Sequence, residues 1–306
     1  MCSSLQIVLF RTLLLVAALM RWGFSAVASA NPVAFVKDVQ FVASFRHENV
    51  TVRLNRASAT TVYPSAPLPL EQILQDPRHR RLRTVPYVDP PWPEDAADFD
   101  WRDVVELPAP TRQKHNECYA HTAQVTLTAL WQTLAKGRAE SPPFDPESLL
   151  RCAHKTPGSL GLPTDIYRVQ KVFREDGECK ANAEGMRLRE HPIVLVDLVG
   201  DRDIENRLEH LLAFSPVSVG IQSNNPVFRL YGGGLLSPEH VETGKPVNHA
   251  VSLVGFGEQD DGTKYWVIRN SWGEDWGENG YAKILRKEDG TGVLGSYAAV
   301  TSASMV

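Results

Sequence analysis

KYWVIRNSWGEDWGENGY, residues 264–281, is the stretch that says most about the fold. Its first six residues, KYWVIR, are rich in β-branched and aromatic side chains and predict a strand. Asn270 and Trp272 follow at once, and a glycine-rich turn leads into a second strand-like run, GYAKIL (280–285). The stretch therefore predicts a β-rich region with Asn270 at the end of one strand.

Upstream, the pattern changes from helical to strand-like. Two further runs, 216–222 (PVSVGIQ) and 249–257 (HAVSLVGFG), predict strands. Four ranges predict helices, from the spacing of their apolar residues or from helix start and stop signals: 120–134, 146–152 (PESLLRC), 164–173 (TDIYRVQKVF) and 202–214 (RDIENRLEHLLAF). A helical half followed by a strand-rich half predicts an α+β molecule with a cleft between two lobes.

The first thirty residues predict a secretory signal peptide. An apolar run, TLLLVAALM (12–20), follows Arg11 and precedes a small-residue cleavage site after Ala30. The run is too short for a comfortable membrane anchor, and no later run is long enough, so we expect no stable membrane insertion. The expected route is the secretory pathway, to a lysosome-like compartment or the cell exterior. Asn49 then becomes a glycosylation site, as the first residue of Asn-Val-Thr.

Between the signal and residue 97 the sequence is weakly patterned. The runs 33–45 (VAFVKDVQFVASF) and 48–54 (ENVTVRL) are interpreted as possible strands. Prolines crowd between 63 and 93, and a basic cluster, RHRRLR, fills 78–83. This part predicts an extended, accessible connection.

The net charge of the chain bears on which partners to expect. The 306 residues carry a formal net charge of −4, with 22% charged and 43% hydrophobic residues. A nearly neutral balance gives no reason to expect nucleic acid or an acidic membrane surface as a partner.

TRQKHNECYAHTAQ (111–124) places Cys118 between two histidines, just before a predicted helix. One hypothesis is a zinc site made by His115, Cys118 and His121, with Cys152 or His154 as the fourth ligand. Another is a nucleophile, because a helix start favours a thiolate. A third is an ordinary buried thiol.

Two other stretches supply what thiol catalysis needs. His249 begins a predicted strand and could pair with the thiolate, while Asn270 could orient the imidazole and Trp272 could shield that hydrogen bond. Gln113, five residues before Cys118, could donate its amide to an oxyanion. The metal hypothesis leaves His249 and Asn270 unexplained.

At these residues the chain resembles the papain-like cysteine proteases. The matching blocks, in the family's order, are DFDWRD (98–103), Gln113 with Cys118-Tyr-Ala, SPVSVGIQ (215–222), FRLYGGGLL (228–236), NHAVSLVGFG (248–257) and the stretch 264–281. The resemblance implies Cys118 as nucleophile, His249 as acid and base, Asn270 as its orienter and Gln113 as oxyanion donor. It implies an endopeptidase acting on proteins or peptides, with no cofactor and no metal.

The resemblance also implies an architecture. A peptidase domain, 98–306, has the papain-like two-lobed fold, with a helical lobe at about 105–195 and a β-barrel-like lobe at about 196–306. The signal peptide is 1–30, and 31–97 is a pro-segment that inhibits the domain from within the same chain until it is removed.

Further residues follow from the resemblance alone. A disulfide joins Cys152 and Cys179, which leaves Cys118 as the free thiol. Substrate-binding positions are Gly161, Leu162, Pro163, Ala250 and Trp272. Because the pocket positions are small or apolar, we expect preference for a hydrophobic residue one place before the cleaved position.

Some positions depart from the family. Gln113 and Cys118 are five residues apart where six is usual, and Glu117 places a carboxylate beside the thiol, which tends to raise a thiol pKa. Leu160 also stands where the family has a glycine. These departures motivate the alternative interpretation of a catalytically impaired binding protein on the same fold. His121 is interpreted as a helix packing residue.

Overall fold

The computed structural model describes residues 32–55, 81–82, 89–114, 117–135, 145–154, 193–197, 203–241, 247–287, 294 and 297–301. Its helices are α3 (Pro32–Ser44), the short η2 (Trp101–Asp103), α5 (Cys118–Ala135), α6 (Pro146–His154), α8 (Ile204–Leu212) and α9 (Pro226–Arg229). Its strands are β1 (Val50–Val52), β2 (Arg81–Leu82), β3 (Phe99–Asp100), β4 (Ile193–Asp197), β5 (Val217–Ile221), β6 (Tyr231–Leu236), β7 (His249–Glu258), β8 (Lys264–Arg269), β9 (Tyr281–Leu285) and β10 (Tyr297–Thr301).

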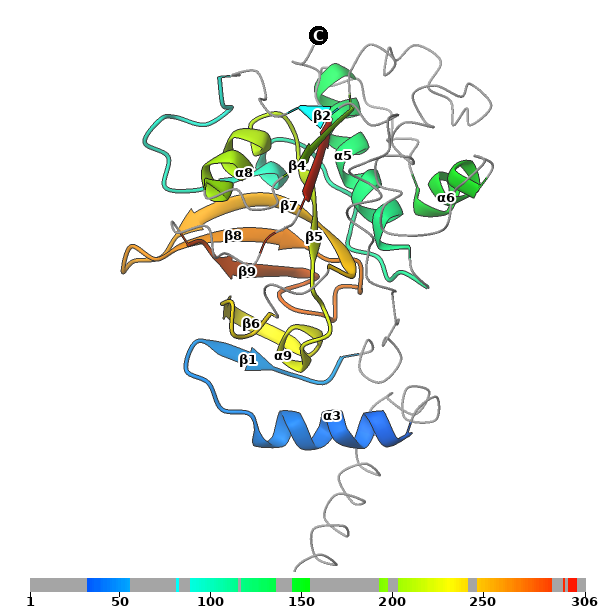
Figure 1. The fold of residues 1–306 in the computed structure, drawn as a ribbon, viewed down its shortest axis with the longest axis vertical. Helices are drawn as coiled ribbons and strands as arrows, with labels where there is room; N and C mark the ends of the chain where they lie inside the picture. The colour runs from blue at the N-terminus through cyan, green and yellow to red at the C-terminus, as the bar shows by residue number, and fades with distance from the viewer. Residues whose placement is uncertain are drawn as a thin grey trace, which may run out of the picture.

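The strands form one mixed sheet. Their order is β1-β6-β9-β8-β7-β5-β10-β4-β2, and β3 pairs with β7 beside this path. The path over the described residues is open, with β1 and β2 at its ends, so the expected barrel-like lobe is an open sheet (Figure 1). The expected α+β class and the strands in 216–222, 249–257 and 280–285 are confirmed, and the strand expected at the start of 264–281 is confirmed as β8, which ends at Arg269.

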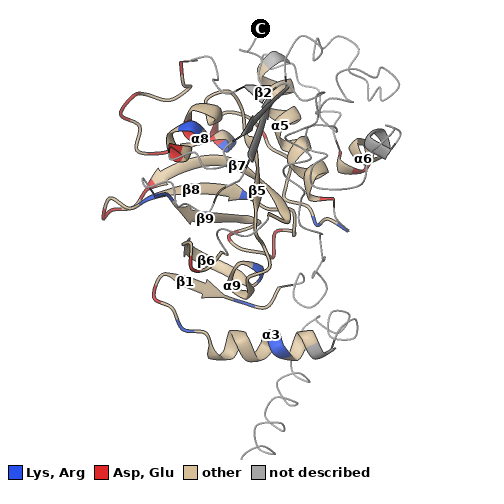
Figure 2. Cartoon of the chain, in the orientation of Figure 1, with Lys and Arg blue, Asp and Glu red and all other residues tan. Residues whose placement is uncertain are grey.

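The centre of the sheet is apolar. β5 and β7 are buried along nearly their whole length, and lysines, arginines and acids lie mainly in turns, helices and strand ends (Figure 2). Trp266 and Trp276 are fully buried in the main core, which α8 covers. Trp101 of η2 joins that core and donates its indole N–H to the Leu212 carbonyl at 3.0 Å. Aromatic burial on this scale stabilises the sheet that carries the site.

The helix α5 confirms the helix expected in 120–134 and positions Cys118 at its first residue. Residues 118–131 are all buried, since α5 packs against β5 and β7. The Thr126 hydroxyl donates to the Pro216 carbonyl at 3.1 Å, which fixes the helix against the chain entering β5. The helices expected in 146–152 and 202–214 are also confirmed as α6 and α8, whereas 164–173 lies outside the described residues.

The prediction of a strand in 33–45 is wrong, because this segment is the helix α3. The β-branched residues of VAFVKDVQFVASF suggested a strand, but its buried side chains Phe35, Asp38 and Val39 follow the i, i+3, i+4 spacing of one helix face. Packing of this face outweighs the modest strand preference of valine. The strand expected in 48–54 is confirmed as β1.

The segment 32–55 docks on the edge of the sheet at β6. β1 pairs antiparallel with β6, with Val50 opposite Gly234 (Figure 1). Gly234 has φ +93°, and a Cβ there would lie 2.1 Å from the Asn49 carbonyl oxygen, so glycine permits this close approach. Beyond β1, the Arg53 guanidinium donates to the Gly277 carbonyl at 2.6 Å.

A buried ion pair holds α3 on the same edge. Asp38 accepts two hydrogen bonds from the Arg229 guanidinium, at 2.6 and 2.8 Å. The Asp38 side chain is 4% exposed and that of Arg229 is 14% exposed. Among the described residues, no helix is long and apolar enough to span a bilayer.

Candidate active site

Adjacent strands bring His249 and Asn270 together. His249 is the first residue of β7, Asn270 follows the last residue of β8, and the two strands pair antiparallel. His249 Nε2 lies 2.8 Å from Asn270 Oδ1, and both residues are buried.

The hydrogen bonds around Asn270 determine which ring nitrogen of His249 carries the proton. The backbone N–H of Ser271 donates to Asn270 Oδ1 at 2.7 Å, which identifies that atom as the amide oxygen. An amide oxygen only accepts, so His249 donates to it through Nε2–H. In the neutral ring Nδ1 is then unprotonated and can accept a proton from another group.

Trp272 covers this pair. Its ring stacks on the His249 ring, with 4.9 Å between centroids and 27° between planes. The rings of Phe228 and Trp276 make edge contacts with the indole, with 5.5 and 5.8 Å between ring centroids. The indole therefore covers one face of the His249 ring, and its shielding of the hydrogen bond stays a prediction.

Cys118 lies next to the start of β7. The thiol contacts the backbone N–H of Ala250, the residue after His249, and those of Tyr119 and Cys118 itself. Each of these N–H groups favours the thiolate, as expected at a helix start. Cys118 is a free cysteine. The site thus combines a thiol and a histidine whose Nδ1 is available.

Burial keeps both groups neutral in this state of the chain. It raises the pKa of the Cys118 thiol to about 11, against the smaller effect of the three N–H groups. It lowers the pKa of His249 to about 4, although the hydrogen bond to Asn270 favours the imidazolium. The Glu117 carboxylate accepts the backbone N–H of Lys114 at 3.1 Å. Burial is therefore the main cause of the raised thiol pKa, whereas the sequence suggested Glu117 as a cause.

Gln113 is hydrogen-bonded to Ser271, the residue after Asn270. Its backbone N–H donates to the Ser271 carbonyl at 2.8 Å, and the Ser271 hydroxyl donates to Gln113 Oε1 at 2.5 Å. With Oε1 identified as the acceptor, the NH₂ end of the amide is the donor that an oxyanion needs. Sequence reasoning missed Ser271, although its place between Asn270 and Trp272 in the opening stretch was a usable signal.

The remaining sequence-predicted residues fall in two groups. Ala250 is buried beside His249, and Asn49 is exposed on the approach to β1. Gly161, Leu162, Pro163, Cys179 and His115 lie outside the described residues, as do the side chains of Cys152 and His154. The disulfide, the substrate pocket and the zinc site around Cys118 therefore stay predictions.

His121, one turn after Cys118 on α5, is buried, in agreement with the packing role expected for it. Its Nδ1 lies 3.1 Å from the Thr111 hydroxyl. Burial, followed by the nearby Arg269 and His249, lowers the pKa of His121 to about 3. His121 is therefore neutral at physiological pH.

Replacing His121 with asparagine is expected to flatten the pH dependence of stability. A neutral buried histidine must gain a proton on unfolding, so it costs stability as pH falls from 6.5 towards 3, by up to about 3 kcal/mol at pH 4. Urea unfolding of the Cys118→Ala chain at pH 7, 5.5 and 4 measures this loss. His210→Asn, at a half-buried site on α8, is the control. If the free energy of unfolding fell as steeply with pH in His121→Asn as in the parent, His121 would not be the cause of the pH dependence.

The geometry agrees with the comparison with known families. Residues 96–302 match the papain family of cysteine proteases. The chain belongs to this family. Two relatives are the thiol protease SEN102 of Hemerocallis, 37% identical over 42% of this chain and 36% of its own length, and the oryzain beta chain of rice (Oryza sativa subsp. japonica), 33% identical over 67% of this chain and 47% of its own. This papain-family chain thus spans only a third to a half of these relatives.

The papain-like fold is also found in solved structures. The digestive procathepsin L2 proteinase from Tenebrio molitor larval midgut superposes with a TM-score of 0.65 at 20% identity, over 94% of this chain and 99% of that one. The digestive procathepsin L 3 of the same larva has a TM-score of 0.62 at 20% identity, over 90% and 92%. At this identity the likeness establishes the fold alone.

Proposed function

We propose that this papain-family chain is the zymogen of a cysteine endopeptidase. The observation that carries the proposal is the pairing of His249 Nε2–H with Asn270 Oδ1, which leaves Nδ1 as a proton acceptor, while the free thiol of Cys118 contacts the backbone N–H of the next residue, Ala250. A general base for a thiol needs an unprotonated ring nitrogen, and this hydrogen bond leaves one at Nδ1.

The residues suggest the steps. His249 Nδ1 takes the proton of Cys118, and the thiolate attacks the carbonyl carbon of the scissile peptide. The Gln113 amide donates to the oxyanion of the tetrahedral intermediate. The His249 imidazolium then protonates the leaving amine, which departs as the acyl-enzyme forms. Water, deprotonated by His249, hydrolyses the thioester and restores the thiol.

The neutral thiol fits a latent form. We propose that 31–97 is the pro-segment, and the first of its described parts, 32–55, is docked on β6. Release of the pro-segment is expected to hydrate the cleft, which lowers the pKa of Cys118 and raises that of His249. Both changes favour the thiolate–imidazolium pair.

Secretion and specificity belong to the same proposal. Residues 1–30 direct the chain to the secretory pathway, where Asn49 is glycosylated and Cys152 pairs with Cys179. Gly161, Leu162, Pro163, Ala250 and Trp272 bind the substrate, and hydrophobic side chains are preferred one place before the cleaved position. The mature form works in a lysosome-like compartment or outside the cell.

Incubating the processed protein with a mixed peptide library and sequencing the products tests the function. We expect cleavage at internal peptide bonds, with a hydrophobic residue one place before the cleaved position. Cys118→Ala should give no cleavage products. The same products from Cys118→Ala, or none from a folded processed chain, would overturn the proposal. The second outcome favours the binding-protein alternative, which the raised thiol pKa supports.

A further inference from the structure

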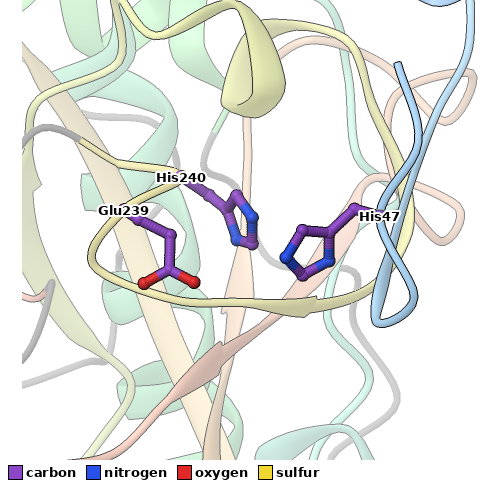
Figure 3. A group of neighbouring side chains, drawn as sticks. All are labelled: His47, Glu239 and His240. Carbon is purple, nitrogen blue, oxygen red and sulfur yellow. The ribbon is translucent and has the colours of Figure 1, made fainter.

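Three side chains with metal-ligating atoms meet where the segment 32–55 contacts the rest of the chain. His47 lies between α3 and β1, while Glu239 and His240 lie in the turn after β6. One ligand atom from each, two imidazole nitrogens and a carboxylate oxygen, lie within 4.8 Å of one another. Figure 3 shows the His240 ring between the Glu239 carboxylate and the His47 ring.

We propose that His47, Glu239 and His240 form a zinc-type cation site that joins the N-terminal segment to the turn after β6. Two imidazoles and a carboxylate are a ligand set that zinc accepts, with water in the fourth position. Magnesium and calcium prefer ligand sets made of oxygen alone. Zinc–ligand distances are about 2.0–2.2 Å, so the three atoms must approach one another by about 1 Å.

The surroundings allow that approach. His47 and Glu239 are exposed and can adjust, whereas His240 is 5% exposed and fixed. His240 Nδ1 accepts the backbone N–H of Ser237 at 3.2 Å and lies 3.0 Å from the Ser237 hydroxyl, and these contacts orient the ring. The two rings meet edge to face with 4.4 Å between centroids. One fixed ligand and two adjustable ones suit an ion that enters from solvent.

Coordination also requires a change at His47. His47 Nδ1 accepts the backbone N–H of Asn49 at 3.2 Å. Coordination through Nε2 moves the ring proton to Nδ1, so this long hydrogen bond must break.

The site has a consequence that rests on the proposed function. If 31–97 is a removable pro-segment, the ion ties it to the peptidase domain through one ligand from the segment and two from the domain. Processing then removes His47 and dismantles the site. Zinc binding itself does not depend on peptidase activity, so the two proposals can fail separately.

Isothermal titration of the full chain carrying Cys118→Ala with zinc chloride at pH 7.5 tests the site. This substitution prevents self-cleavage and removes a thiol, a side chain to which zinc can bind. We expect one zinc ion per chain at this site and no competition from magnesium. His47→Ala and Glu239→Gln, both at exposed positions, are each expected to weaken binding by at least about 10-fold.

His210→Ala, a histidine on α8 outside the cluster, is the matched control and should bind zinc as the parent does. Zinc bound with the same stoichiometry and affinity in His47→Ala and Glu239→Gln would overturn the proposal. Absence of binding to the parent chain would do the same. Because the change at each of these two positions lies at the surface, loss of binding there is separable from misfolding, which circular dichroism monitors.

Discussion

Replacing His249 with alanine in the processed protein is expected to lower kcat/KM for a cleavable peptide by about 10⁴-fold. In the proposed mechanism His249 takes the proton of Cys118 and returns it to the leaving amine, and proton transfer by a positioned side chain contributes up to about 10⁴-fold. Its Nδ1 is unprotonated because Nε2–H is bound to Asn270. Steady-state hydrolysis of a fluorogenic peptide measures the change.

Asn270→Ala is the comparison that separates positioning from chemistry. The hydrogen bond to a charged imidazolium contributes about 1.5–3 kcal/mol, which corresponds to a loss of roughly 10- to 100-fold. The pH profile should also change, because Asn270 raises the pKa of His249. Because the thiolate–imidazolium pair is lost when the imidazolium deprotonates, the alkaline limb of kcat/KM should move to lower pH. A loss as large in Asn270→Ala as in His249→Ala would contradict the roles assigned to the pair.

Replacing Asp38 with alanine is expected to detach the N-terminal segment from β6. The change leaves the Arg229 guanidinium buried without its carboxylate partner, and breaking such a pair costs about 3–5 kcal/mol. The docking equilibrium should then fall by a hundredfold or more. Hydrogen–deuterium exchange of 32–55 in the Cys118→Ala chain measures the loss of protection.

Asp260→Ala, at an exposed position between β7 and β8, is the control for loss of one acidic charge. Removing both partners, with Asp38→Ala and Arg229→Ala together, should cost less than the sum of the single changes, because no unpaired charge is left. Unchanged protection of 32–55 in Asp38→Ala would show that the ion pair does not hold the segment.

The sequence predicted most of the strand-rich half of the chain. The runs containing His249 and Asn270 have the period and composition of strands, and their order puts both residues at strand ends. Cys118 at a helix start was equally readable, since Ala120, Ala123 and Leu127 recur at helical spacing. These local signals agree with the packing, which is why the predictions were confirmed.

Other features depend on contacts that one sequence does not reveal. VAFVKDVQFVASF was predicted as strand because valine favours strands, but the burial of Phe35 and Val39 on one face makes it the helix α3. The raised pKa of Cys118 has burial as its main cause, and burial comes from the assembled fold. The rings of His47 and His240 are in contact although the two residues are almost two hundred positions apart in the sequence.

Labelling of the processed protein with an epoxide-type probe of cysteine proteases, followed by peptide mapping, tests whether Cys118 is an activated nucleophile. The expected result is one modified residue, Cys118, with no label in Cys118→Ala and slower labelling in the unprocessed chain. A folded, processed chain that takes no label at Cys118 would contradict it, because the thiol would then lack the activation that the His249–Asn270 pair is proposed to supply.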